Sequence, residues 1–338
     1  MASQTAPEPA TVHQADANEN PYPPPPAVVD AIVRAAGNAN RYPEVYPQAL
    51  ADAIAAHHGV PAEHVTVGAG GAGLIQQMLH LVAKAKGEAL FAWRSFEGYP
   101  LIAQGMGVPV RQVPLRDHRH DLDAMLKAVR RKTKLIFVCN PNNPTGAGIR
   151  EDELVRFLDR VSPRVFVVID EVYREFGTDP ATADGLRLYP RYPNVVVLRS
   201  FSKAYGLAGM RVGYAVGQQG PIGGLRGVTM PFLVSRPALE AAMAALGESA
   251  LYEEQYKLIA AERDRVTTEL RKGGLEVPDS EGNFVWLPLG AKSADFAAAV
   301  KAEGMAVHAF DGEGVRVTIG LPDSNDTLIR VATDGRFA

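Results

Sequence analysis

Short apolar runs alternate with segments of helical periodicity along most of the chain, and this alternation predicts a repeated strand–helix order. The runs Leu135–Cys139 and Val165–Ile169 are apolar at every position, which is typical of strands buried on both faces of a parallel sheet. Repeated units of this kind predict an α/β fold with right-handed crossovers, whose ligands bind beyond the carboxyl ends of the strands. The other predicted strands are Val65–Val67, Ala89–Ala92, Val108–Val113, Val195–Leu198 and Val212–Val216, and the predicted helices are Ala27–Ala36, Leu50–His58, Leu74–Ala85 and Leu122–Val129.

The two ends of the chain carry different patterns. Residues 1–26 are polar and rich in proline, and because proline lacks a backbone donor and fixes φ, they predict an extended arm lying on the rest of the protein. Near the other end, one long helix is predicted from Arg236 to about Leu270. The apolar runs Phe284–Leu287 and Val315–Ile319 and a helix over Ser293–Glu303 follow it. The predicted parts are therefore an N-terminal arm (1–30), a large domain (31–234) and a small α+β domain (235–338).

Composition limits the class of protein. At ~150 residues per domain, 338 residues are enough for about two domains, and 46% hydrophobic with 22% charged residues is ordinary globular composition. A formal net charge of −3 without basic runs argues against nucleic acid or an anionic membrane as a partner. No apolar stretch approaches the ~18 residues of a membrane span. The first 20 residues also lack the apolar core of a signal peptide, so a cytoplasmic protein is predicted.

Metal and disulfide chemistry are not predicted. The single cysteine, Cys139, excludes an intrachain disulfide and a cysteine-based zinc site. The neighbouring His57 and His58 would point about 100° apart on a helix, so they cannot face one ion.

The segment Ser200–Gly213 directly follows a predicted buried strand, which places its polar side chains at the strand's carboxyl end. It carries two serines, Lys203, and Arg211 eight residues later. A lysine amine condenses with a carbonyl compound to form a Schiff base if its neighbours keep it partly neutral. Hydroxyls and an arginine beside it suit an anionic ligand, although a lysine taken alone is more often simply solvated.

Two more polar segments follow buried strands in the same way. Asn140–Gly146 comes after Leu135–Cys139, and taken alone it is a turn sequence. Asp170–Tyr173 comes after Val165–Ile169. An acid at the tip of an apolar strand must be hydrogen-bonded or paired, because an unpaired buried carboxylate is costly. The alternative for Asp170 is a helix N-cap.

The fourth segment, Gly68–Gly73, is rich in glycine and separates a predicted strand from the helix beginning near Leu74. Glycines there let backbone N–H groups approach an anion at a helix N-terminus. Most glycine-rich turns are merely tight turns, and this one lacks the spacing of a dinucleotide-binding loop.

The order of these four segments resembles the fold-type-I pyridoxal-phosphate-dependent aminotransferases, over nearly the whole chain from Asn18 to Arg316. Within that class the chain is most similar to the histidinol-phosphate aminotransferase branch, and especially to its aromatic (phenylalanine) aminotransferase relatives, in Phe91–Pro100 and Asp170–Phe176. The resemblance implies an α/β fold whose large domain has a mainly parallel, seven-stranded sheet between helices. It also implies a small α+β domain and an extended N-terminal arm.

The resemblance implies specific roles around the cofactor. Lys203 would hold pyridoxal 5′-phosphate as a Schiff base and move the substrate proton. Asp170 would face the pyridine nitrogen, where its charge favours the protonated ring. Tyr173 and Asn143 would hydrogen-bond the ring's 3′-oxygen. Phe96 would stack on the ring, the alternative being an ordinary core aromatic.

The cofactor phosphate would be bound by Ser200, Ser202 and Arg211 together with the backbone around Gly71 and Ala72. Relatives commonly carry polar or acidic side chains in that last loop, and this chain has none. The resemblance therefore implies backbone contacts there.

Two further residues matter for the cofactor and the substrate. Tyr42 matches the tyrosine that reaches the phosphate of the neighbouring subunit, which implies a homodimer with shared active sites. Arg316, between Val315 and Val317, matches the arginine that binds the substrate's α-carboxylate, which suits its bidentate geometry. A structural salt bridge is the alternative for Arg316.

The substrate side chain is the least defined part of the site. Where relatives often carry an arginine for a substrate phosphate, this chain has His308. The replacement argues against a phosphorylated substrate, although a histidine can still donate a hydrogen bond to a phosphate. Tyr22, Phe232 and Phe96 are candidates to line an apolar pocket for an aromatic side chain.

Together these observations predict pyridoxal-phosphate-dependent transamination of aromatic L-amino acids, phenylalanine in particular, with a 2-oxo acid such as 2-oxoglutarate. The alternative is a histidinol-phosphate aminotransferase of histidine biosynthesis, and a third possibility is a related decarboxylase of a phosphorylated amino acid. A non-catalytic ligand-sensing module is disfavoured, because the sequence has no helix-turn-helix extension and carries every expected catalytic residue type.

Overall fold

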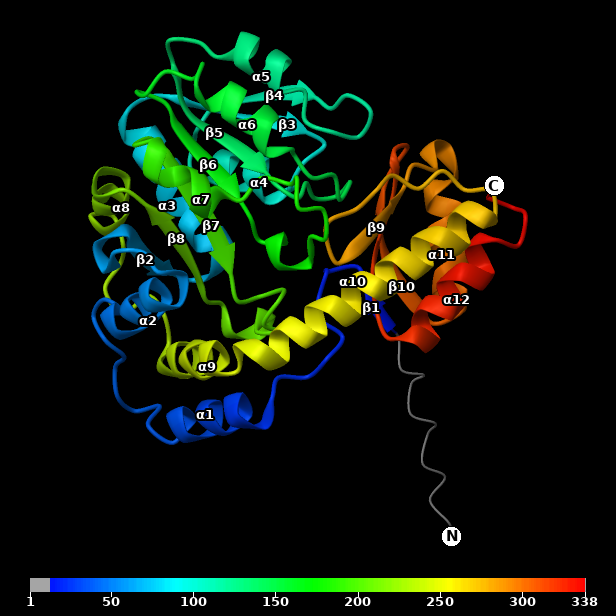
Figure 1. Cartoon of the computed structure of the whole chain (residues 1–338), viewed down its shortest axis with the longest axis horizontal. Coiled ribbons are helices and arrows are strands. Elements are labelled where there is room, and N and C mark those ends of the chain that lie inside the picture. The colour runs from blue at the N-terminus through cyan, green and yellow to red at the C-terminus, as the bar shows by residue number, and fades with distance from the viewer. Residues whose placement is uncertain (1–12, 338) are drawn as a thin grey trace.

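Two β-sheets organise the computed structural model, which describes residues 13–337 (Figure 1). The larger sheet has seven strands in the order β2-β8-β7-β6-β5-β3-β4. Its strands from β7 to β4 are parallel, and β8 runs antiparallel to both of its neighbours. This confirms the predicted mainly parallel seven-stranded sheet. Its strands are β2 (Val65–Gly68), β3 (Glu88–Trp93), β4 (Val110–Pro114), β5 (Thr133–Cys139), β6 (Phe166–Asp170), β7 (Val195–Ser200) and β8 (Gly213–Gly217).

Helices cover both faces of the large sheet, because its inner strands are apolar on both sides. Along β5, Phe137 belongs to the cluster formed with α3, α4 and α8, whereas Ile136 and Val138 belong to the cluster on the opposite face, with α2, α5, α6 and α7. The helices are α1 (Pro26–Ala36), α2 (Gln48–His58), α3 (Gly70–Lys84), α4 (Gly98–Gly105), α5 (Leu122–Ala128), α6 (Glu151–Leu158), α7 (Gly185–Leu188), α8 (Gln219–Arg226), α9 (Arg236–Gly247), α10 (Ser249–Lys272), α11 (Ser293–Ala302) and α12 (Pro322–Ala332).

The smaller sheet has the order β1-β10-β11-β9, and α11 packs against it (Figure 1). β1 (His13–Ala15) is its edge strand and pairs in parallel with β10 (Met305–Phe310), while β11 (Gly314–Thr318) and β9 (Phe284–Leu287) complete it in antiparallel fashion. The predicted arm therefore lies on the small sheet, with β1 as an edge strand that its sequence did not suggest. Residues 1–12 of that arm lie outside the described residues.

The predicted single helix from Arg236 to Leu270 is wrong in one respect, because two helices occupy this stretch. α9 ends at Gly247 and α10 begins at Ser249, and glycine is about 1 kcal/mol less favourable than alanine in a helix interior. α9 packs against α1 and α2, below the large sheet in Figure 1, whereas α10 runs on to the small sheet. The predicted boundaries of the three parts stay a prediction.

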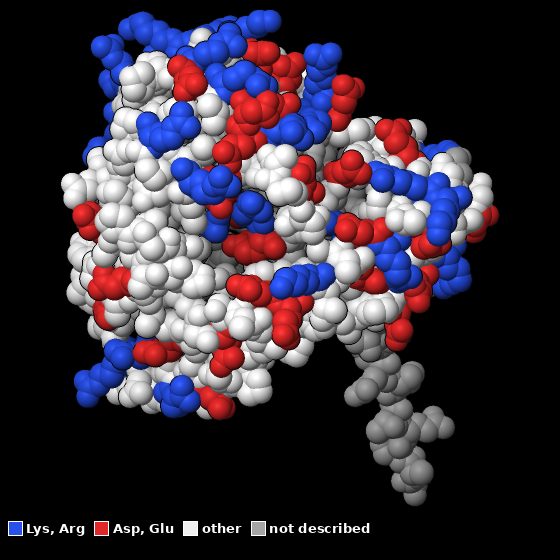
Figure 2. Space-filling view, viewed as in Figure 1, with Lys and Arg blue, Asp and Glu red and all other residues white. Residues whose placement is uncertain are grey.

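Charges of both signs are interspersed over the face shown in Figure 2, as expected for a net charge of −3. Within residues 13–337 no helix combines the length and apolar character of a membrane span. The same residues contain no group of three or more histidine, cysteine, aspartate or glutamate side chains placed to hold a metal ion.

A buried ion pair ties β7 to the loop after β6. The Arg199 guanidinium lies 2.7 Å from Glu171, whose side chain is fully buried, and 3.1 Å from Asp184. Removing one partner of such a pair leaves an uncompensated buried charge. We therefore expect Arg199→Leu to lower the free energy of unfolding by about 3–5 kcal/mol in urea denaturation.

The control for this prediction is Arg156→Leu, which breaks an exposed pair with Asp152 and is expected to cost only about 0–1 kcal/mol. Equal losses in the two variants would contradict the prediction.

Candidate active site

The carboxyl ends of β5, β6 and β7 open into one cavity of about 430 Å³ that β10 and β11 reach from the small sheet. Parallel strands present their carboxyl ends at the same edge of a sheet, so the segments that follow them meet there. The predicted residues that line this cavity are Gly71, Ala72, Phe96, Asn143, Asp170, Tyr173, Ser200, Ser202, Lys203, Arg211, His308 and Arg316.

Lys203 lies in the loop after β7, and its Nζ donates a hydrogen bond to the carbonyl oxygen of Ala17 at 2.5 Å. Burial lowers the pKa of Lys203 to about 8, and the positive charges of Arg316 and Arg211 act in the same direction. A lysine with this pKa is partly neutral near physiological pH, which is the form that attacks a carbonyl group.

This pKa predicts how fast the protein takes up pyridoxal 5′-phosphate at different pH values. Because only the neutral amine reacts, we expect the rate of covalent association to rise about tenfold per pH unit below pH 8 and to level off above it. Absorbance after rapid mixing measures this rate. The reaction with Nα-acetyl-lysine is the control, since its amine has a pKa of about 10.4 and its rate should keep rising beyond pH 9. A protein profile that followed the control would contradict the prediction.

Asp170 is the last residue of β6, and a buried tyrosine donates a hydrogen bond to its carboxylate. The hydroxyl of Tyr99 donates to Asp170 Oδ2 at 2.6 Å, and the ring of Tyr99 stacks on Phe137 with centroids 4.4 Å apart. Burial raises the pKa of Asp170 to about 6 and so disfavours its charged form. A positively charged partner in the cavity would favour the charged form again. Nothing in the sequence around Tyr99 marks it as a site residue, although it lies within the segment that carries the resemblance.

The Tyr173 hydroxyl is oriented by two amides. It accepts hydrogen bonds from Asn143 Nδ2 at 3.2 Å and from Asn18 Nδ2 at 3.0 Å. A phenolic oxygen that accepts two N–H groups has its own hydrogen left to donate elsewhere, and here the cavity lies beside it. Burial raises the pKa of Tyr173 to about 12, which keeps it a donor.

Asn18 is a site residue that the sequence analysis missed. It is 1% exposed, and its backbone N–H donates to Thr318 Oγ1 at 2.9 Å. Its carbonyl oxygen accepts from Asn283 Nδ2 at 3.2 Å. The arm thus reaches the cavity between the two sheets and joins Tyr173 to β11. Only its place in a segment matching the family could have pointed to this residue.

Three side chains form a polar cradle on one wall. Ser200 Oγ lies 2.9 Å from Ser202 Oγ, and Arg211 Nη1 donates to Ser202 Oγ at 3.4 Å. Two hydroxyls and a guanidinium converging in this way suit a phosphate group.

The amino end of α3 completes the cradle and corrects the sequence-based prediction. The helix begins at Gly70 rather than near Leu74, so Gly71 and Ala72 lie in its first turn. Gly70 has φ of +69°, a conformation that favours glycine, and a Cβ there would also lie 2.8 Å from Arg211 Nη2. The free N–H groups and dipole of a helix start favour an anion at this position.

Arg316 projects from β11 and is buried. Its Nη1 donates to Asn143 Oδ1 at 2.7 Å and its Nη2 donates to the carbonyl oxygen of Asp16, while its Nε is buried without a partner. No carboxylate of residues 13–337 lies within 4.0 Å of the Arg316 guanidinium. Within these residues Arg316 therefore does not form the structural salt bridge that was the alternative to ligand binding. The guanidinium therefore retains capacity for an anionic ligand.

Two predicted residues lie outside the cavity of this chain. Tyr42 is 77% exposed, and its ring lies 4.7 Å from that of Phe232 at a tilt of 33°. Tyr22 is half-buried in the arm. Of the three residues suggested for an apolar pocket, Phe96 alone lines the cavity in the described part of the chain. The roles of Tyr22 and Tyr42 stay predictions.

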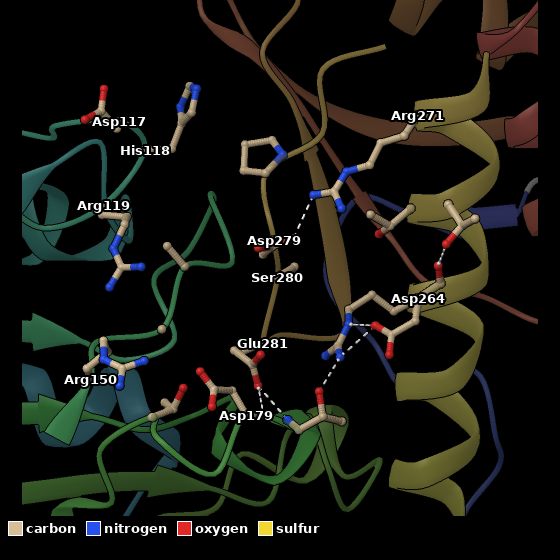
Figure 3. Close-up of a pocket in the computed structure, with 18 residues that line it drawn as sticks. Asp117, His118, Arg119, Arg150, Asp179, Asp264, Arg271, Asp279, Ser280 and Glu281 are labelled. Atoms are coloured by element: carbon tan, nitrogen blue, oxygen red, sulfur yellow. Dashed lines mark hydrogen bonds and ion pairs between the residues drawn. The ribbon is translucent and has the colours of Figure 1, made fainter. Parts of the chain in front are cut away.

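A second cavity, of about 570 Å³, lies between the large-sheet loops and the amino-terminal approach to β9 (Figure 3). Its charged side chains include paired ones: Arg271 lies 2.7 Å from Asp279, and Arg119 lies 3.1 Å from Glu153. None of the predicted site residues lines it among residues 13–337. Figure 3 shows Arg119 and Arg150 on one wall facing Asp279 and Glu281 on the other, so this cavity is a polar cleft between the two parts of the molecule.

Comparison with known proteins gives matches along most of the chain. The family model described as aminotransferase class I and II matches residues 14–332. An aromatic amino acid aminotransferase of Thermobifida fusca is 49% identical over 93% of this chain and 88% of that protein. One of Streptomyces avermitilis is 47% identical over 94% of this chain and 89% of that protein.

Solved structures agree at the level of the fold. The histidinol-phosphate aminotransferase of Sinorhizobium meliloti, in complex with pyridoxal-5′-phosphate, superposes with a TM-score of 0.86 at 30% identity, covering 96% of this chain and 90% of that one. A structure named as a putative histidinol-phosphate aminotransferase, from Erwinia carotovora, gives a TM-score of 0.88 at 25% identity over 95% of both chains.

Proposed function

The chain belongs to the class I and II aminotransferases, and from this premise we propose that it transfers the amino group of aromatic L-amino acids to a 2-oxo acid such as 2-oxoglutarate. The reaction class rests on the placement of Lys203, Asp170 and Arg316 around one cavity. The aromatic substrate rests on relatives of that name that are 46–49% identical along more than nine-tenths of this chain.

The residues around the cavity fit pyridoxal 5′-phosphate. The lysine amine suits its aldehyde, the Asp170 carboxylate suits its ring nitrogen, and the cradle of Ser200, Ser202 and Arg211 suits its phosphate. Arg316 lines the same cavity and pairs with no carboxylate of the described residues, so its guanidinium suits a substrate carboxylate. When bound, pyridoxal phosphate supplies an electron sink for the negative charge that forms as the substrate Cα loses its proton.

Each side chain then has a distinct task. The neutral Lys203 Nζ would accept the proton from the substrate Cα and would deliver it to the C4′ carbon of the cofactor. Asp170, held by Tyr99, keeps a negative charge at the ring nitrogen. Arg316 binds the α-carboxylate and so orients the Cα–H bond. Tyr173, with its oxygen fixed by two amides, directs its hydrogen into the cavity.

We also propose a homodimer whose subunits share their sites. The exposed Tyr42 supports it, because this ring lies beside another exposed aromatic ring instead of in the cavity of its own chain. Phe232 and Val45, which are also exposed, lie beside it: the Phe232 ring is 4.7 Å from that of Tyr42, and the Phe232 N–H donates to the carbonyl oxygen of Val45. Light scattering of the purified protein tests this proposal, and a monomer with full activity would overturn it. The cytoplasmic location stays a prediction.

The experiment that tests the function is the absorbance spectrum of the purified protein before and after addition of L-phenylalanine or histidinol phosphate. Bleaching of the visible cofactor band by phenylalanine supports the proposal. Bleaching mainly by histidinol phosphate favours the second candidate, which the names of the structural neighbours suggest. The absence of any band with added pyridoxal phosphate would overturn both.

A further inference from the structure

The arm residue Asn18 is almost completely buried, although it lies in a connecting segment. It follows β1 of the small sheet and precedes α1, which lies below the large sheet (Figure 1). Its φ of +53° is in the left-handed region, which asparagine adopts more readily than most residues. Its side chain bonds to Tyr173, which follows β6, and to Thr318 of β11. Asn18 therefore connects the two sheets at the cavity.

Two hydrogen bonds to Thr318 fix the direction of the Asn18 amide. The backbone N–H of Asn18 can only donate, so Thr318 Oγ1 accepts from it at 2.9 Å, and the Thr318 hydroxyl donates in turn to Asn18 Oδ1 at 3.1 Å. Because its oxygen faces Thr318, the amide presents its NH₂ group to the Tyr173 hydroxyl oxygen, at 3.0 Å. The Asn18 side chain thus has one orientation, with a donor toward Tyr173.

The Tyr173 ring and the Tyr173 hydroxyl are held by different neighbours. The ring packs edge-on against Phe284 with centroids 5.0 Å apart, so its place does not depend on Asn18. The second donor to the hydroxyl oxygen is Asn143, whose own amide is fixed by a 2.7 Å hydrogen bond from Arg316 to Asn143 Oδ1. Hydrogen bonds in a chain polarise one another, so two N–H groups on its oxygen make the hydroxyl a stronger donor. Burial raises the pKa of Tyr173, and the hydrogen bond from Asn18 acts against that rise.

We propose that Asn18 is a positioning residue for the cofactor, because its donation to the Tyr173 oxygen directs the Tyr173 hydrogen toward the 3′-oxygen of bound pyridoxal phosphate. This inference rests on the proposed function, since it concerns how the same site holds its cofactor. A hydrogen bond to the 3′-oxygen stabilises negative charge on that oxygen, and so weakens its attraction for a proton on the Lys203 nitrogen. Loss of the Asn18 amide is therefore expected to raise the pH at which the visible band of the bound cofactor titrates.

The first measurement is a pH titration of the visible band of the protein loaded with pyridoxal phosphate. We expect Asn18→Gly to raise the apparent pKa of this band by about 0.5–1 pH unit, the effect of one net hydrogen bond. Glycine accepts the φ of +53° and removes the amide. The charged groups that act on Tyr173 and Lys203 stay in place; they are Arg316, Asp170, Arg211 and Glu19.

A double-mutant cycle with Tyr173→Phe separates this role from a purely structural one. If Asn18 acts through the Tyr173 hydroxyl, Asn18→Gly raises the apparent pKa in the parent protein and leaves it unchanged in Tyr173→Phe. If Asn18 only holds the arm in place, the shift is the same in both backgrounds. The dissociation constant of pyridoxal phosphate is measured in the same four proteins. That second cycle decides the matter if the band does not titrate in the pH range in which the protein is stable.

Asn20→Gly is the matched control. Asn20 lies in the same arm, and its Nδ2 donates across to the carbonyl oxygen of Ala204 at 3.0 Å, so the substitution removes an anchor of the arm and leaves the Tyr173 hydroxyl with both of its donors. Its band should titrate as in the parent protein.

Asn18→Asp is the second variant, in case the glycine variant does not hold the cofactor. The aspartate keeps an oxygen toward Thr318 and turns the Tyr173 hydrogen toward its carboxylate, away from the cavity. We expect a rise in the apparent pKa at least as large as with glycine. The rise should be larger in the parent protein than in Tyr173→Phe, because the added charge acts in both backgrounds and the hydrogen bond in only one.

Equal effects of Asn18→Gly in the two backgrounds would overturn the inference, as would a shift in Asn20→Gly as large as that in Asn18→Gly. In either case, a parent protein whose visible band bleaches with phenylalanine leaves the proposed function standing. If the parent protein forms no visible band with pyridoxal phosphate, the proposed function fails and the inference fails with it.

Discussion

Lys203→Ala is expected to lower phenylalanine turnover by at least about 10⁴-fold, the upper range of what a positioned acid–base group contributes. The variant loses both the amine that holds the cofactor and the group that moves the substrate proton. In the parent protein, the pKa of about 8 suits Lys203 to both tasks. Steady-state kinetics with phenylalanine measures the loss, and mass spectrometry after borohydride reduction shows whether the cofactor is still attached.

Lys203→Arg is the matched control for this variant. It keeps a positive charge near Ala17 and the cradle, but its guanidinium stays protonated and does not form the covalent link. We expect the same loss as for alanine with better retention of the fold. Substantial turnover, or borohydride-stable attachment, in either variant would contradict the assignment of Lys203.

Asp170→Asn is expected to lower kcat for phenylalanine about 10²–10³-fold, the range seen when one preorganised electrostatic group is removed. Asparagine fills the same volume and still accepts a hydrogen bond from Tyr99, but it carries no charge toward the ring nitrogen. The carboxylate is buried, which raises its pKa to about 6, so the substitution removes a charge that acts in a site of low water content.

Tyr99→Phe provides the comparison for Asp170→Asn. It removes one hydrogen bond to Asp170 at 2.6 Å and keeps the charge, so the expected loss is about tenfold. Stopped-flow measurement of the loss of the cofactor band with phenylalanine separates the chemical step from binding. A kcat for Asp170→Asn within threefold of the parent would contradict the electrostatic role.

The site residues could be predicted from the sequence where they directly follow apolar strands. Asp170 and Lys203 each come directly after a run of buried residues, so periodicity alone placed them at one edge of the sheet. Their identity as a set came from the resemblance, because an acid or a lysine in such a place has other common explanations.

Contacts between distant parts of the chain were not predictable in this way. Asn18 reaches Tyr173 across 155 residues, and Glu97 meets His308 only because the small sheet is folded against the large one. Neither pair leaves a periodic signal. The start of α3 was missed for a local reason, since Gly70–Gly73 has the composition of a turn although it forms the first turn of the helix.

The contacts made by the arm also determine the order in which the parts of the site can form during synthesis. Asn18 bonds to Thr318 and Asp16 to Arg316, each across 300 residues. At ~5–20 residues per second, a ribosome takes about 15–60 s to add those residues. The arm is synthesised first, and it cannot make these contacts until β11 has been synthesised. Strands β5 to β7 can pair earlier, so the cradle of Ser200, Ser202 and Arg211 can form before the carboxylate site at Arg316. A chain that terminates before β11 contains the residues of the cradle but lacks Arg316.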